Sequence, residues 1–170
     1  MKKFFKSLML ISVCLGLSAT VNAKTFRYAT TGDILGLDPH ANNEGPTNTM
    51  KGNIYGRMLH RKADLSLEPD LATKWEKLDA NTWRFSLRRG VKFHNGNDFN
   101  ADDVLFSYKR QTQEASDMSF ALATIKQINK VDDYTVDLIT KGPDPILLLN
   151  MPMFYIVDKE WIEANNAFEV

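Results

Sequence analysis

The sequence predicts a mixed α/β fold assembled from short strands, hairpins and short helices. Two stretches, residues 71–88 and 125–139, show the alternation of apolar and polar residues that is typical of strands with one buried face. Two others, residues 47–59 and the segment that follows Asn100, carry apolar side chains near helical spacing. No internal repeat or low-complexity segment interrupts these patterns. We therefore expect one domain of ordinary size.

The first residues have the composition of a cleavable export signal. Three lysines stand at the start, an apolar stretch follows at 8–17, and small residues end the segment at Ala23. The apolar stretch is shorter than the roughly 20 residues that a spanning helix needs, which argues against the alternative of a membrane anchor. We predict a signal peptide at 1–23, cleavage between Ala23 and Lys24, and a mature chain at 24–170 that supplies the N-terminal portion of a larger domain.

Cleavage would also remove Cys14, the one cysteine of the sequence. A lipoprotein is a second alternative, but Val13 precedes Cys14 where lipid attachment needs Gly, Ala or Ser. A mature chain without cysteine has neither a disulfide framework nor a thiolate site. With the three lysines removed it carries 18 basic and 21 acidic residues, a net charge of −3. This charge argues against a nucleic-acid partner.

The mature chain is expected to begin with a strand at residues 25–29, which alternate, and a polar loop at 30–33. A strand that feeds a loop is a common position for a ligand. A stretch with Pro and Gly at 38–46 then precedes a helix predicted over 47–59. The apolar stripe of that helix consists of Met50, Ile54, Met58 and Leu59.

Two antiparallel hairpins are predicted in the middle of the chain. The first pairs residues 71–78 with 82–88, and the second pairs 125–131 with 134–139 around two adjacent aspartates. The apolar side chains that alternate in them, and that we assign to a core, are Trp75, Trp83, Phe85, Leu87, Tyr134, Val136 and Leu138.

Turn and cap residues mark the remaining elements. Residues 91–93 read as extended, and Asn95-Gly96 marks a tight turn. Asn100 has the character of an N-cap for a helix whose buried face includes Val104, Leu105 and Tyr108. Residues 158–170 could open another helix, but we find no cap or Gly at its end.

No catalytic template fits the sequence. It lacks a Gly-x-Ser-x-Gly elbow, a His-Glu-x-x-His pair, a phosphate loop and a Gly-x-Gly-x-x-Gly turn. His40, His60 and His94 are far apart, so we favour structural histidines over metal ligands, although they could converge in space. The pairs Asp102-Asp103 and Asp132-Asp133 stand at a helix start and a hairpin turn, where Asp serves the backbone.

Three ordered blocks carry a resemblance to a known family. They are EPDLATKWE at 68–76, TWRFSLRRGVKFHNG at 82–96 and NADDVLFSY at 100–108. They closely resemble the signature of family 5 extracellular solute-binding proteins, the oligopeptide and dipeptide receptors of bacterial ABC importers. The segments 37–40, 54–59 and 131–136 agree, so that the resemblance covers residues 24–170.

The resemblance implies a periplasmic-binding-protein-like fold of two lobes, of which this chain supplies only the N-terminal part of the first lobe and its small subdomain. It implies a monomeric periplasmic receptor, not an enzyme, that uses no cofactor or metal and passes its solute to an inner-membrane ABC permease. The expected ligand is a di- or oligopeptide. A nickel complex, haem or an oligosaccharide is an alternative within the family, and a truncated, non-transporting secreted interaction module is an alternative of another class.

By position in the fold, the residues expected to touch the ligand are Thr30, Thr31, Gly32 and Asp33. In the family, the acidic partner of the peptide amino group comes from the other lobe, so no residue here receives that role. A good site encloses roughly 70–90% of its ligand. We therefore expect residues 24–170 by themselves to bind peptide weakly.

Overall fold

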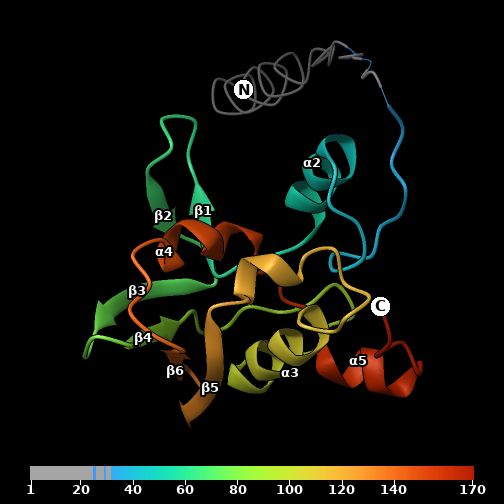
Figure 1. Cartoon of the computed structure of the whole chain (residues 1–170). Helices are drawn as coiled ribbons and strands as arrows, with labels where there is room; N and C mark the ends of the chain where they lie inside the picture. The colour runs from blue at the N-terminus through green and yellow to red at the C-terminus, as the bar shows by residue number, and fades with distance from the viewer. Residues whose placement is uncertain (1–24, 26–28, 30–31) are drawn as a thin grey trace, which may run out of the picture. The chain divides into compact units, whose positions relative to one another are not determined.

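The computed structural model describes Thr25, Ala29 and residues 32–170 (Figure 1). The predicted signal peptide, its cleavage junction at Ala23 and Lys24, and most of the predicted first strand lie outside the described residues. Within the described part of the chain, every helix is too short or too polar to cross a membrane.

A four-stranded antiparallel sheet of order β3-β4-β6-β5 forms the centre of the fold. The predicted hairpins are confirmed as β3 (Ala72–Lys77) with β4 (Thr82–Leu87), and β5 (Ile125–Asp132) with β6 (Thr135–Thr140). The two hairpins join through antiparallel pairing of β4 with β6. This junction was not predicted, because pairing between separate hairpins leaves no local pattern in a sequence.

One face of the sheet is buried, as the alternation predicts. Phe85 and Val136 pair across β4 and β6, and neither is exposed to solvent. Trp75 and Trp83 pack against the same core while remaining partly exposed. Because successive side chains of a strand point to opposite faces, the other face carries polar residues such as Arg84. The interpretation of these aromatic residues as core is confirmed.

Helix α3 (Ala101–Gln111) contributes to the same core through Val104. Its start is a complete capping box: the side chain of Asn100 accepts a backbone N–H of the first turn, and Asp103 accepts the backbone N–H of Asn100 at 2.9 Å. The hydroxyl of Tyr108 donates to the carbonyl of Ile125 in β5 at 3.0 Å. The predicted N-cap is therefore confirmed.

The helix predicted over 47–59 is shorter than expected. Helix α2 (Gly45–Ile54) ends before Gly56, and the chain continues extended into β1 (Leu59–Arg61), which pairs with β2 (Leu67–Pro69). A Cβ atom at Gly56 would lie 2.9 Å from Cδ1 of Leu71, so the backbone passes this core side chain closely. The helix end is thus decided by packing against a distant segment.

The buried face of α2 also differs from the prediction. Its fully buried residues are Thr47 and Lys51, whereas Ile54 from the predicted apolar stripe is 37% exposed. Met58 and Leu59 are fully buried, but they lie beyond the helix. A polar side chain that is hydrogen-bonded in the interior looks like a surface residue when only the sequence is read.

Short elements complete the fold: η1 (Ser119–Leu122), α4 (Leu147–Asn150), η2 (Met151–Met153) and α5 (Lys159–Ala164). Asp158 caps the start of α5 by accepting the N–H of Trp161 at 3.0 Å. The expectation that this helix has no terminating residue is wrong. Asn166 adopts the left-handed conformation with φ of 53°, and the N–H of Ala167 then returns to the carbonyl of Ile162.

Candidate functional site

The described residues of the predicted ligand contact lie in a loop that we call loop 32–37. Thr30 and Thr31 lie outside the described residues, while Gly32 and Asp33 open the loop. Asp33 is exposed, and its Oδ1 accepts the N–H of Ile34 at 2.8 Å. A Cβ at Gly32 would lie 3.5 Å from Cγ of Pro46, which places the start of the loop beside the first turn of α2.

Two polar side chains hold loop 32–37 to α2 and its end. The hydroxyl of Thr47 accepts the backbone N–H of Leu35 at 3.0 Å and donates to the carboxylate of Glu44. The phenol of Tyr55 donates to the carbonyl of Leu37 at 2.9 Å, and burial raises the pKa of this phenol. The loop backbone is therefore fixed at both of these positions, although its side chains are largely exposed.

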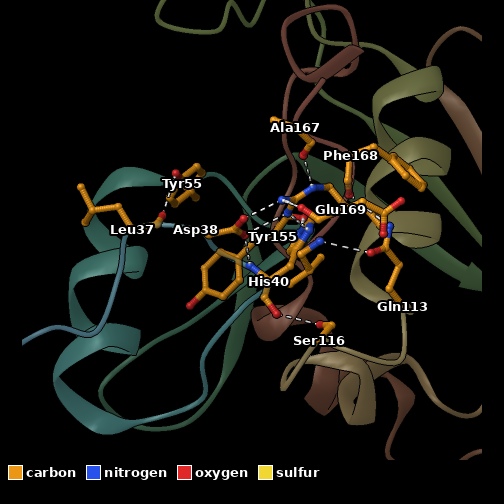
Figure 2. A network of polar contacts seen from close by, with 12 residues as sticks. Leu37, Asp38, His40, Tyr55, Gln113, Ser116, Tyr155, Ala167, Phe168 and Glu169 are labelled. Atoms are coloured by element: carbon orange, nitrogen blue, oxygen red, sulfur yellow. Dashed lines mark hydrogen bonds and ion pairs between the residues drawn. The ribbon is translucent and has the colours of Figure 1, made fainter. Parts of the chain in front are cut away.

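A buried polar cluster follows immediately after the loop, centred on Arg110 of α3 (Figure 2). Nη1 and Nη2 of Arg110 donate to the two carboxylate oxygens of Asp38 at 2.9 and 2.5 Å. Nε donates to the carbonyl of Ala167 at 3.1 Å, and Nη2 to that of Glu169 at 3.2 Å. Nη1 also lies 3.1 Å from Nδ1 of His40. A guanidinium has five N–H donors, so these five acceptors saturate it.

The N–H group of Arg110 that faces His40 determines which ring nitrogen of His40 carries the proton. Because Nδ1 of His40 faces a donor, it must be the acceptor, and the proton must sit on Nε2, which lies 3.0 Å from the carbonyl of Tyr155. Burial of the ring, together with the positive charges of Arg110 and Lys51, lowers the pKa of His40 to about 4 against the opposing effects of Tyr155 and Asp38. His40 is thus a neutral, structural histidine, as predicted.

The other groups of the cluster are also paired. Burial by itself raises the pKa of Asp38, but the hydrogen bonds from Arg110 and from the backbone of His40 outweigh it, so the net pKa is lowered. Lys51 is fully buried on α2, where burial lowers its pKa and its ammonium group donates to the carbonyl of Asn42. Asp38, Lys51 and Arg110 are therefore each held in place by hydrogen bonds.

A cavity of about 560 Å³ lies beside this cluster. Its walls come from residues 37–39, the end of α2, residues 91–95, and α5 with the residues before it. The aromatic rings of Tyr55, Phe93 and Trp161 line it together with Asp38, His94 and Asp158. A hollow of this size with a mostly apolar lining can enclose an apolar side chain or ring.

The carboxylates of Asp103, Asp158 and Glu160 form the one group of three metal-ligand side chains among the described residues. Burial raises the pKa of Asp103 to about 6. Its oxygens accept the backbone N–H groups of Asn100 and Lys159, at 2.9 and 3.0 Å, and Asp158 caps α5. We therefore interpret this group as helix capping.

Sequence reasoning missed Arg110, Lys51 and Tyr55. The signal that could have identified Arg110 is its spacing: it lies three residues after Ser107 and seven after Asp103, on the buried face of α3. A charged residue at a buried position of a helix needs a partner, but its partner lies 72 residues earlier in the chain.

The chain belongs to a known family of bacterial receptors. Residues 66–169 match the sequence model of the bacterial extracellular solute-binding proteins, family 5, middle region. Proteins of this family are extracellular or periplasmic and bind solutes.

Individual relatives agree with this assignment. The chain is similar to the dipeptide-binding protein of Escherichia coli K12, with 32% identity over 176 residues that cover 89% of this chain and 33% of that protein. It is 33% identical over 155 residues to heme-binding protein A of Haemophilus influenzae, covering 78% of this chain and 28% of that protein.

A solved structure confirms the predicted fold. The chain is similar to the periplasmic binding protein DppA of Helicobacter pylori in complex with the peptide STSA, with a TM-score of 0.69 and 29% identity. The match covers 81% of this chain and 32% of that one. The chain therefore spans about a third of the length of the relatives it matches.

Proposed function

We propose that this chain belongs to a periplasmic receptor that captures di- or oligopeptides and delivers them to an ABC permease in the inner membrane. The observation that carries the proposal is the similarity, over 89% of the chain, to a dipeptide-binding protein. The structural match to a peptide-bound relative supports it. The receptor is proposed to act as a monomer, without a cofactor and without covalent chemistry.

In this proposal, loop 32–37 and the two residues before it contribute to one wall of the ligand cleft. The contacts proposed are Thr30, Thr31, Gly32 and Asp33. Extended peptides are commonly held by backbone hydrogen bonds, and residues 30–33 are proposed to take part in such contacts. Capture is driven by a ligand that binds the closed arrangement of two lobes better than the open one.

A second candidate ligand is haem, favoured by the 33% identity to heme-binding protein A over 78% of the chain. Haem is a flat macrocycle that absorbs visible light, whereas a peptide does not, so the two ligands are easily separated in an experiment. Haem binding gives an absorption band in the visible range, and peptide binding does not.

The test uses the mature protein as the cell produces it. Native mass spectrometry should show a retained peptide, and calorimetry with a panel of dipeptides should show binding at one site, with each peptide recovered intact. A mass of several hundred residues that starts at Lys24 would also agree with the predicted export signal. Hydrolysis of the bound peptides would contradict the proposal, and a haem spectrum without peptide binding would favour the second candidate.

A further inference from the structure

The two end segments of the described unit meet at one side chain. Asp38 and His40 belong to the segment that follows loop 32–37, and Ala167 and Glu169 belong to the segment that follows α5. All four contact Arg110, whose own side chain is only 3% exposed. Figure 2 shows Asp38 and His40 of the first segment close to Ala167 and Glu169 of the second.

Each segment has further contacts of its own. The hydroxyl of Ser116 donates to the carbonyl oxygen of His40 at 2.7 Å. On the other side, Gln113 donates to the carbonyl of Phe168 at 3.0 Å and accepts the N–H of Val170 at 3.2 Å. These contacts hold one segment each, whereas Arg110 holds both.

We propose that Arg110 is a positioning residue that couples residues 38–40, which directly follow loop 32–37, to the segment 167–169, and so helps to fix the adjoining loop in the arrangement that meets the ligand. The proposal has two parts, the coupling of the two segments and the positioning of the loop for the ligand, and only the second part rests on the proposed function. The first part, the coupling of two segments, follows from the five matched donors of one buried guanidinium. A preorganised loop loses less conformational freedom on binding, which improves affinity.

The coupling makes a distinctive prediction about Asp38. This residue bonds Arg110 but is not among the partners of segment 167–169. Without the carboxylate of Asp38, the guanidinium of Arg110 can shift. Its hydrogen bonds to the carbonyl groups of Ala167 and Glu169 are then weakened. A purely local role of Asp38 would disturb the segment around residues 32–41 and leave residues 165–170 unchanged.

The experiment is hydrogen exchange followed by mass spectrometry on the mature protein, comparing Asp38→Asn and Arg110→Lys with wild type. Lysine keeps the charge of Arg110 but has three donors and no planar fork. Both variants should raise the exchange rate about tenfold in peptides covering 32–41 and also in those covering 165–170. The matched control is Arg84→Lys, which alters another bidentate arginine–aspartate pair and should change neither.

A change confined to 32–41 in Asp38→Asn would overturn the coupling, and so would wild-type exchange in both segments. If Arg110→Lys fails to fold, Asp38→Asn still tests the coupling. Asp38 is one-third exposed, so its replacement should destabilise the fold less. Titration with the same panel of dipeptides separates the two proposals. No binding by wild type would sink the proposed function, whereas equal affinity of wild type and Asp38→Asn would sink the role of Arg110 in ligand positioning.

Discussion

Two arginine–aspartate pairs in this protein are both bidentate but have different surroundings. Arg84 and Asp137 face each other across β4 and β6 on the polar side of the sheet, at 2.7 and 2.8 Å. Arg110 and Asp38 are joined at 2.9 and 2.5 Å, with the guanidinium buried and the carboxylate partly exposed. The side chain of Arg84 is 35% exposed and that of Asp137 16%, whereas Arg110 is 3% exposed and its partner Asp38 34%.

The difference lies in what each arginine joins. The strands that carry Arg84 and Asp137 are already held by the backbone ladder of the sheet, so this pair adds to an existing contact. Arg110 connects segments that are 72 and 57 residues away from it, and no backbone ladder joins them. Two bidentate arginine–aspartate pairs can therefore differ in what they contribute to the structure.

The largest expected effect comes from Arg110→Met, which keeps much of the side-chain volume but removes all five donors. It leaves the partly buried carboxylate of Asp38 and two carbonyl groups without their partner. We expect the free energy of unfolding to fall by about 3 kcal/mol, at the lower end of the range for breaking a buried ion pair because Asp38 keeps some contact with water. Urea unfolding at pH 7 measures this loss, and a change within error would contradict the account.

The next effect concerns pH and His40. The pKa of this imidazole is lowered to about 4, so the unfolded chain binds a proton below about pH 6.5 while the folded protein does not until about pH 4. The stabilising effect of neutral His40 is therefore complete above pH 6.5 and is lost as the pH falls towards 4. Compared with His40→Asn, wild type should lose its stability advantage over this interval, by up to about 3 kcal/mol.

The comparison with a variant is necessary here because Asp103 acts in the opposite direction. Burial raises its pKa to about 6, so the folded protein gains a proton as the pH falls from 6 to 4, and this gain stabilises it. The pH profile of wild type by itself mixes the two groups. Urea unfolding of wild type and His40→Asn at several pH values isolates His40, and a pH-independent difference between the two proteins would refute its assignment.

A smaller effect is expected from Tyr55→Phe, which removes the hydrogen bond to the carbonyl of Leu37 but keeps the ring. The matched control is Tyr108→Phe, which removes the analogous bond to Ile125 in the sheet. Each should lower the free energy of unfolding by about 0.5–1.5 kcal/mol. Only Tyr55→Phe should raise hydrogen exchange in residues 32–41, and equal exchange in the two variants would show that Tyr55 does not hold the loop.

The smallest effect is expected from Arg84→Met. Solvent and salt screen its pair with Asp137, and the strands stay paired through their backbone. The urea midpoint should stay close to that of wild type. A destabilisation as large as that of Arg110→Met would remove the distinction between the two regions.

The sequence could predict the parts of this fold that local patterns determine, but not those that distant contacts determine. Alternation around Phe85 and the cap at Asn100 are local patterns, and the structure confirms both hairpins and the start of α3. The end of α2 at Ile54 is set by packing of Gly56 against Leu71, which no local pattern records.

The same reasoning applies to the candidate site. The interpretation of His40 as structural holds, but its partner Arg110 lies 70 residues away and could not be identified from spacing. The ligand contacts proposed from the family, Gly32 and Asp33 among them, stay predictions. Their position in the loop beside α2 defines where to test them.

A double-mutant cycle compares the two regions most directly. Urea unfolding of Arg110→Met, Asp38→Asn and the double variant gives the coupling energy between Arg110 and Asp38, and the same set at Arg84 and Asp137 gives that of the pair on the sheet. We expect a coupling of about 2 kcal/mol between Arg110 and Asp38, and a clearly smaller one between Arg84 and Asp137. Equal couplings, or additive effects at Arg110 and Asp38, would contradict this expectation.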